Sequence, residues 1–180
     1  LFLFLLIVSC SDDSDNPEVY QNLPIEFKVP SNFPQLVYNL QNNPITEKGF
    51  ELGKKLFYDG RLASDGIVSC AFCHEQSSAF SHHGHTFSNG VNNMIGTRNT
   101  PSIQNLAFQP IFMYDGAADH LDIQPVIPFT SAIEMNGNFA TAIAMMKADA
   151  EYTKLFKLAF ANGEIDSENM LKAFAQFMVM

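Results

Sequence analysis

Five consecutive residues, Cys70-Ala71-Phe72-Cys73-His74, constrain this chain more than any other part of its sequence. They form a C-x-x-C-H run, the pattern at which a c-type haem is attached. Two thiols three positions apart on a short helical turn can each form a thioether with one vinyl group of a porphyrin. His74 then lies under the iron as its proximal ligand. The run therefore predicts one covalently bound haem c, held by Cys70, Cys73 and His74.

Two other chemistries can use a C-x-x-C pair. A redox dithiol does not need the following histidine, and it usually lies in a βαβ context that this sequence lacks. A zinc site needs two further ligands, which the nearby residues His82, His83 and His85 could supply. Haem attachment is the interpretation that uses all three residues of the motif.

The N-terminus predicts export. Residues 1–8 are an unbroken apolar run, too short for a bilayer span of about 20 residues. The run continues into Ile7-Val8-Ser9-Cys10, which is typical of a lipobox. We therefore expect residues 1–10 to be a partial lipoprotein signal, with Cys10 lipidated and the protein anchored by lipid at the periplasmic face or the outer membrane. The alternatives are an ordinary secretory signal or a buried N-terminal strand.

The rest of the chain divides into a leader and one domain. Residues 11–43 form an acidic tether and a proline-rich extended lead-in, where long helices are disfavoured. Residues 44–180 are of a length for one domain and predict a cytochrome c-type haem domain. The sequence lacks an initiator Met, and the apolar face of its last predicted helix continues to Met180. We therefore expect a chain truncated at both ends.

The hydrophobic pattern predicts a mainly α fold, a cytochrome c-like haem domain with long loops. Thr46 is expected to cap a helix that ends near Tyr58, and Ser167 to cap the last one. Other helices are expected over residues 101–107, 138–148 and 151–161. Residues 59–99, rich in Gly, Ser, His and Asn, predict loops around one short helix. No β alternation of useful length occurs.

The composition of the chain limits the classes of partner that it can bind. The net charge is −9, which argues against nucleic acid, whose phosphates attract a basic face. An acidic surface could bind a basic electron-carrying protein. It could equally be a solvated surface without a partner. The 17 Phe and 8 Met residues provide ample material for a core around a flat apolar cofactor.

Several further motifs occur before and after the haem-attachment run, in the order found in one protein family. The chain resembles the N-terminal half of the bacterial di-haem cytochrome c peroxidases, a group that includes the MauG-like proteins, over about residues 44–180. The matching stretches are Leu52-Gly53-Lys54-Lys55-Leu56-Phe57-Tyr58-Asp59, Arg61-Leu62-Ala63-Ser64-Asp65-Gly66-Ile67-Val68-Ser69-Cys70, Arg98-Asn99-Thr100-Pro101-Ser102, Tyr114-Asp115-Gly116, Gln124-Pro125, Pro128 and Glu134-Met135.

The resemblance implies a peroxidase with two haem domains, of which the second is missing from this sequence. In such an enzyme the N-terminal haem reacts with hydrogen peroxide, which is reduced to water. The C-terminal haem receives electrons from a small electron-donor protein such as a cytochrome c. The resemblance also leaves a homodimer open.

The resemblance assigns roles to three further residues. Glu134 matches the distal acid–base residue, and Gln124 matches a glutamine of the same pocket. Asn99 matches a residue associated with a calcium ion between the two haem domains. A carboxylate within reach of both peroxide oxygens can move the proton that heterolysis requires, and an apolar pocket raises its pKa toward working pH. The alternative to a catalytic role is structural. Glu134 would then be an exposed loop carboxylate or a charge at the N-terminus of the following helix, and Gln124 would make a hydrogen bond within a loop.

Two departures from the family pattern affect the site. Tyr114 stands where the family usually has a Trp that relays electrons between haems, and Ala117 replaces the usual Arg. Some members also cap the peroxidatic haem with a loop histidine. Here His85 is the best candidate for that distal ligand. The alternative is that His82, His83 and His85 are all loop histidines that face solvent.

Two other functions share these motifs. A MauG-like haem oxidase would draw electrons from another substrate. A non-catalytic electron-transfer c-type cytochrome needs a strong sixth ligand, for which Met94, Met113 and Met135 are available.

Overall fold

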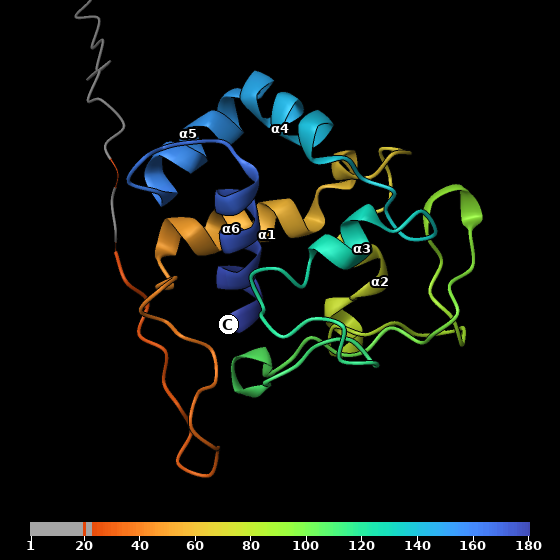
Figure 1. Ribbon diagram of the computed structural model, residues 1–180, viewed down its shortest axis with the longest axis horizontal. Coiled ribbons are helices and arrows are strands. Elements are labelled where there is room, and N and C mark those ends of the chain that lie inside the picture. The colour runs from red at the N-terminus through yellow and green to blue at the C-terminus, as the bar shows by residue number, and fades with distance from the viewer. Residues whose placement is uncertain (1–19, 21–22) are drawn as a thin grey trace, which may run out of the picture.

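The computed structural model describes residue 20 and residues 23–180, and the fold is mainly α as the sequence predicts. Within those residues, β pairing is limited to isolated bridges. Figure 1 shows α1 and α6 at the centre, α4 and α5 above them, and α2 and α3 among long loops on one side. The α-helices are α1 (Glu47–Tyr58), α2 (Cys70–Cys73), α3 (Val126–Thr130), α4 (Phe139–Ala148), α5 (Ala150–Ala159) and α6 (Ser167–Val179). Short 3-10 turns are η1 (Gly60–Leu62), η2 (Gln76–Ser78), η3 (Val91–Asn93) and η4 (Leu106–Phe108).

The centre of the core is the contact between α1 and α6. Leu52 and Leu56 of α1 are fully buried, as is Met170 of α6. The two helices approach closely because α1 has a glycine at the contact. A Cβ added to Gly53 would lie 2.0 Å from the backbone oxygen of Ala173. Gly53 is therefore required by packing, since any side chain would push the helices apart.

Local capping explains where three of the helices begin. Thr46 Oγ1 accepts the Gly49 N–H at 3.0 Å, which confirms the predicted cap of α1. Asn138 caps α4 through the Thr141 N–H. The cap of α6 was expected at Ser167 and is instead Asp166, whose carboxylate accepts the Asn169 N–H at 2.8 Å.

No helix in residues 23–180 combines the length and apolar character that a membrane crossing requires.

The helix expected over residues 101–107 is wrong. Only the η4 turn (Leu106–Phe108) forms there, after Asn105 adopts a left-handed φ of 60°. Upstream polar groups find distant partners instead: the Thr100 N–H donates to His82 Nε2, and Ser102 Oγ donates to the Ala79 carbonyl. These long-range bonds hold the segment extended against the loop that follows α2.

The lead-in packs against the helical core. The Ile25 N–H donates to the Ile45 carbonyl at 3.0 Å, and the Phe33 ring packs edge-on against Phe108. Further along, Asn43 donates from Nδ2 to the Lys172 carbonyl, and its amide oxygen accepts from Gln176 Nε2 at 2.9 Å. Because both amides are buried and paired, they fix the lead-in against α6.

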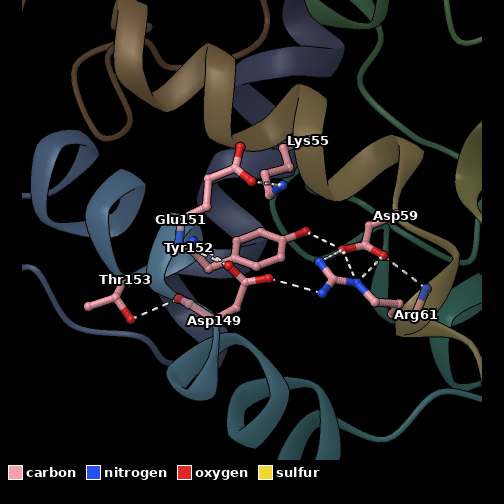
Figure 2. A network of polar contacts seen from close by, with 7 residues as sticks. All are labelled: Lys55, Asp59, Arg61, Asp149, Glu151, Tyr152 and Thr153. Atoms are coloured by element: carbon pink, nitrogen blue, oxygen red, sulfur yellow. Dashed lines mark hydrogen bonds and ion pairs between the residues drawn. The ribbon is translucent and has the colours of Figure 1, made fainter.

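A second polar network joins the end of α1 to the start of α5 (Figure 2). Asp59 accepts from the Tyr152 hydroxyl at 2.7 Å and from the Arg61 guanidinium at 2.7 Å. Arg61 also donates to Asp149, which caps α5. Partial burial opposes ionisation of Asp59, but the bonds from Arg61 and Tyr152 outweigh it and lower the pKa of this carboxyl. The network fixes the chain that leads toward Cys70.

Tyr152→Phe is expected to lower the free energy of unfolding by about 1.5–3 kcal/mol. The ring is fully buried and stays in place, while the nearly buried Asp59 carboxylate loses a hydrogen-bond donor. Urea unfolding measures the change. Tyr58→Phe is the matched control, because Tyr58 is 44% exposed. Equal shifts of the two midpoints would contradict a stabilising role for the hydroxyl.

Candidate active site

The haem-attachment motif occupies one tight helical turn. The His74 N–H donates to the Cys70 carbonyl at 2.9 Å and closes α2. Burial raises the pKa of the Cys70 thiol to about 12 and that of Cys73 to about 11, where the charges of Glu134 and Glu75 add to the effect. Protonated thiols are poor exchange nucleophiles, so this environment does not favour a redox dithiol.

The imidazole of His74 is oriented by backbone bonds to Phe80 and Pro101. Its Nδ1 lies 2.9 Å from the Phe80 carbonyl oxygen, which can only accept, so Nδ1 carries the proton. The acceptor is presented by a turn in which Ala79 and Phe80 both have a left-handed φ. Burial lowers the pKa of His74 and favours the neutral ring. The Nε2 lone pair is therefore the one available for a metal, the arrangement typical of ligating histidines.

A cavity of about 400 Å³ opens beside this ring. Its walls bring together segments that lie far apart in the sequence: α2, the loop of residues 88–103, the loop of residues 111–117, and the region around α3. Cys70 packs against the core and is not part of the lining. The residues of the lining that the sequence singled out are Cys73, His74, Asn99, Met113, Tyr114, Gln124 and Glu134.

Glu134 is held on the cavity wall by its backbone. It follows α3 in a turn closed by its N–H to the Ser131 carbonyl, and its own carbonyl accepts the Val91 N–H at 2.8 Å. Gly90 lies directly beneath, where a Cβ would come within 2.0 Å of the Ile133 oxygen and 2.7 Å of the Glu134 Cα. Burial raises the pKa of the Glu134 carboxyl, and a side-chain bond from Ser131 partly offsets this. A carboxyl with a raised pKa suits proton transfer.

Gln124 lies two residues before α3. Its backbone N–H donates to the His120 and Leu121 carbonyls, and two residues earlier the Asp122 carboxylate accepts from the Tyr38 hydroxyl at 2.5 Å. The Gln124 side chain donates from Nε2 to the sulfur of Met113 at 3.4 Å. Both Gln124 and Glu134 thus face the same cavity as His74.

Tyr114 and Asn99 lie at the rim of this cavity. Tyr114 is 60% exposed although it contributes to the lining, so it reaches from the cavity to the surface. Beside it, Arg98 donates to Asp115 at 3.0 Å across the rim. Asn99 is exposed and contributes to the same wall.

The structure does not bring His85 to the cavity. Its ring stacks on His82 with centroids 4.3 Å apart, and its Nδ1 bonds to the Phe87 carbonyl. His83 pairs with Glu75 at 2.8 Å. In the described part of the chain, no three His, Cys, Asp or Glu side chains converge as a metal site, so the geometry does not support zinc.

The sequence alone missed two features of the site. Gly90 supports the Glu134 backbone, and its signal was an isolated glycine in a loop where many glycines occur. The Cys73 thiol also lies 3.5 Å from the Asn89 carbonyl, which lines the cavity. No sequence pattern marks a contact of this kind, since it depends on how α2 and a later loop fold together.

Comparison with known proteins identifies the family. The profile of the family described as di-haem cytochrome c peroxidase matches residues 47–180, and the chain belongs to this family. A methylamine utilization protein MauG from Methylophilus methylotrophus is 32% identical over 179 residues, 98% of this chain and 52% of that protein. The cytochrome c551 peroxidase of Pseudomonas aeruginosa is 32% identical over 142 residues, 78% of this chain and 41% of that enzyme. The chain spans about half the length of the curated relatives it matches.

A solved structure agrees with this assignment. A MauG-like protein associated with microbial copper homeostasis superposes with a TM-score of 0.78 at 32% identity, over 86% of this chain and 46% of that one. Haem c is the cofactor that the family implies. The residues present fit it, because His74 has its Nδ1 proton engaged and its Nε2 lone pair available beside a cavity that also includes Cys73.

Proposed function

We propose that this chain is the peroxidatic haem domain of a di-haem peroxidase that reduces hydrogen peroxide to water. Cys70 and Cys73 would hold haem c by thioether bonds, and His74 would ligate the iron. The observation that carries the proposal is the shared cavity, which places His74, Gln124 and Glu134 around one space. When bound, the haem would supply a Lewis-acidic iron through which electrons could reach the peroxide.

Within that cavity the protein's own residues would handle protons and orientation. The Glu134 carboxylate would accept a proton from one peroxide oxygen and return it to the oxygen that leaves as water. The neutral amide of Gln124 would orient peroxide without adding charge. Overall, one peroxide, two electrons and two protons give two waters. The electrons would come from a small electron-donor protein such as a cytochrome c, through a second haem domain.

The direct test is the reaction of the haem-loaded chain with hydrogen peroxide in a stopped-flow instrument. We expect a second-order reaction that saturating cyanide abolishes. A haem that binds neither peroxide nor cyanide would support an electron-transfer cytochrome with a closed sixth position. Met113 is the candidate ligand for that alternative, because Met94 and Met135 do not line the cavity.

The rate of this reaction should depend on pH through Glu134. Burial raises the pKa of this carboxyl above its ordinary value of 4.5, so the carboxylate that accepts the proton forms only at higher pH. The rate is therefore expected to fall with acid at a pH above 4.5 and to reach a plateau on the basic side. Stopped-flow measurements from about pH 4 to about pH 8 test this, because that range covers the pKa values of most perturbed carboxyls. A midpoint at or below 4.5 would contradict a buried general base.

A MauG-like oxidase remains the second candidate function. Similarity to the MauG of Methylophilus methylotrophus favours it, as does Tyr114, which reaches from the cavity to the surface. Tyr can be oxidised with loss of its phenolic proton, and so could relay electrons. A substrate screen on the peroxide-treated holoprotein separates this function from peroxide removal.

The proposal extends to the parts of the protein around this domain. Residues 1–10 would be a lipoprotein signal that ends at Cys10, residues 11–43 a tether and lead-in, and residues 44–180 the haem domain. Cys10 lies outside the described residues. The protein would be exported and anchored by lipid, since thioether attachment of haem takes place outside the bacterial cytoplasm. Asn99 would offer one oxygen to a calcium ion, which needs 6–8 oxygen ligands in all.

A further inference from the structure

We propose that Met113 is a sulfoxidation site, at which hydrogen peroxide held in the cavity oxidises the thioether and so shifts the contact that positions Gln124. This inference rests on the proposed function only in that peroxide must enter the cavity. Met113 lines the cavity, and its sulfur accepts the Gln124 amide proton at 3.4 Å. Met113 thus borders the substrate space and contacts a residue proposed to bind substrate.

A tight turn holds the backbone that carries the Met113 side chain. Met113 adopts a left-handed φ of 69°, and its carbonyl accepts the Gly116 N–H in a tight turn. The turn is closed by paired bonds between Phe112 and Ala118, the shorter of 2.7 Å. A methionine is normally flexible, but this one starts from a backbone that has little freedom to move it away from the cavity.

The other methionines are less well placed. Met135, Met146, Met170 and Met178 are buried, at 5%, 0%, 0% and 8% exposure, and neither they nor the half-buried Met145 line the cavity. Met94 and Met180 are 44% and 55% exposed and do not line the cavity either. Exposure alone would therefore direct oxidation to Met94 and Met180, whereas peroxide concentrated in the cavity would direct it to the half-buried Met113.

The reaction needs no further reagent. A sulfur lone pair attacks one oxygen of hydrogen peroxide, the S–O bond forms, the O–O bond breaks, and the other oxygen leaves as water with both protons. The sulfur loses two electrons and the peroxide gains them. The product is a polar sulfoxide in place of an apolar thioether, and reductases reverse it. The new oxygen is a stronger acceptor than the sulfur and lies one bond away from it, so the Gln124 amide has to shift to bond to it.

The site is tested by treating the haem-loaded chain with a few equivalents of hydrogen peroxide without reductant. Fragment-ion mass spectrometry then locates each added oxygen. We expect at least about threefold more sulfoxide at Met113 than at Met94 or Met180. With tert-butyl hydroperoxide, a bulkier oxidant, the order should reverse. Equal patterns with the two oxidants, or no preference for Met113, would overturn the proposal.

The link to Gln124 is tested on the same samples. The wild-type rate with peroxide is expected to fall by about twofold or more after oxidation and to recover with methionine sulfoxide reductases. Met113→Leu removes the sulfur, so its rate should not change with either treatment. A wild-type rate unaffected by Met113 sulfoxide would overturn the link. Because sulfoxide is measured by mass, an unreactive haem would refute the proposed function without deciding this inference.

Discussion

Glu134→Gln is expected to lower the rate constant for reaction with hydrogen peroxide by about 10²–10⁴-fold, the usual contribution of a positioned general acid–base group. The amide keeps the size and hydrogen-bonding capacity of the carboxyl but cannot accept a proton near neutral pH. The backbone at this position is held by the Val91 N–H and by Gly90, so we expect little displacement of the side chain. Stopped-flow kinetics at pH 7 measures the change.

Glu75→Gln is the matched control for this variant. Both carboxylates raise the pKa of Cys73 through their charge, but Glu75 does not line the cavity. We expect its rate to stay within about threefold of the wild type, because the variant removes a long-range charge and the pair with His83 but no group on the cavity wall. Equal losses in the two variants would mean that net charge near the haem, and not proton transfer by Glu134, controls the reaction.

Gly53→Ala is expected to destabilise the domain by about 3 kcal/mol, near the upper end of the usual cost of overpacking. The added Cβ would lie 2.0 Å from the Ala173 carbonyl oxygen, and a backbone oxygen cannot rotate away as a side chain can. Helix propensity alone would favour Ala, so packing and propensity predict opposite signs. The urea unfolding midpoint decides between them.

Lys54→Ala on the next residue of α1 controls for the change in helix sequence. Lys54 is exposed, so its replacement should shift the free energy of unfolding by no more than about 0.5 kcal/mol. Peroxide reactivity of folded Gly53→Ala reports whether the separation of α1 and α6 reaches the haem site. A stabilised Gly53→Ala variant would refute the close contact of the two helices.

The elements that the sequence predicted well are those set by local chemistry. Thr46 caps its helix through a group three residues away, and Cys70 and His74 share one turn. The helix predicted over residues 101–107 does not form. The hydrogen-bond partners of this segment come from about twenty residues upstream, as in the bond from Ser102 to Ala79. Local propensity cannot anticipate such bonds.

The same distinction applies to the candidate site. The resemblance named Gln124 and Glu134, and the structure places both on the wall of a cavity beside His74. It could not reveal that Gln124 bonds to Met113, because that contact depends on the fold of two separate loops. His85 shows the converse, since a residue in a suggestive sequence position stacks on His82 away from the cavity.

The measurement that tests the central claim most directly is acid-acetone extraction of the exported protein, matured in a host that attaches haem c. Thioether bonds through Cys70 and Cys73 should keep the pigment on the polypeptide, and the intact mass should increase by one haem. The Cys70→Ala, Cys73→Ala double variant should lose the pigment to the solvent. A colourless wild-type polypeptide, or pigment that the solvent removes from it, would contradict covalent haem at this motif.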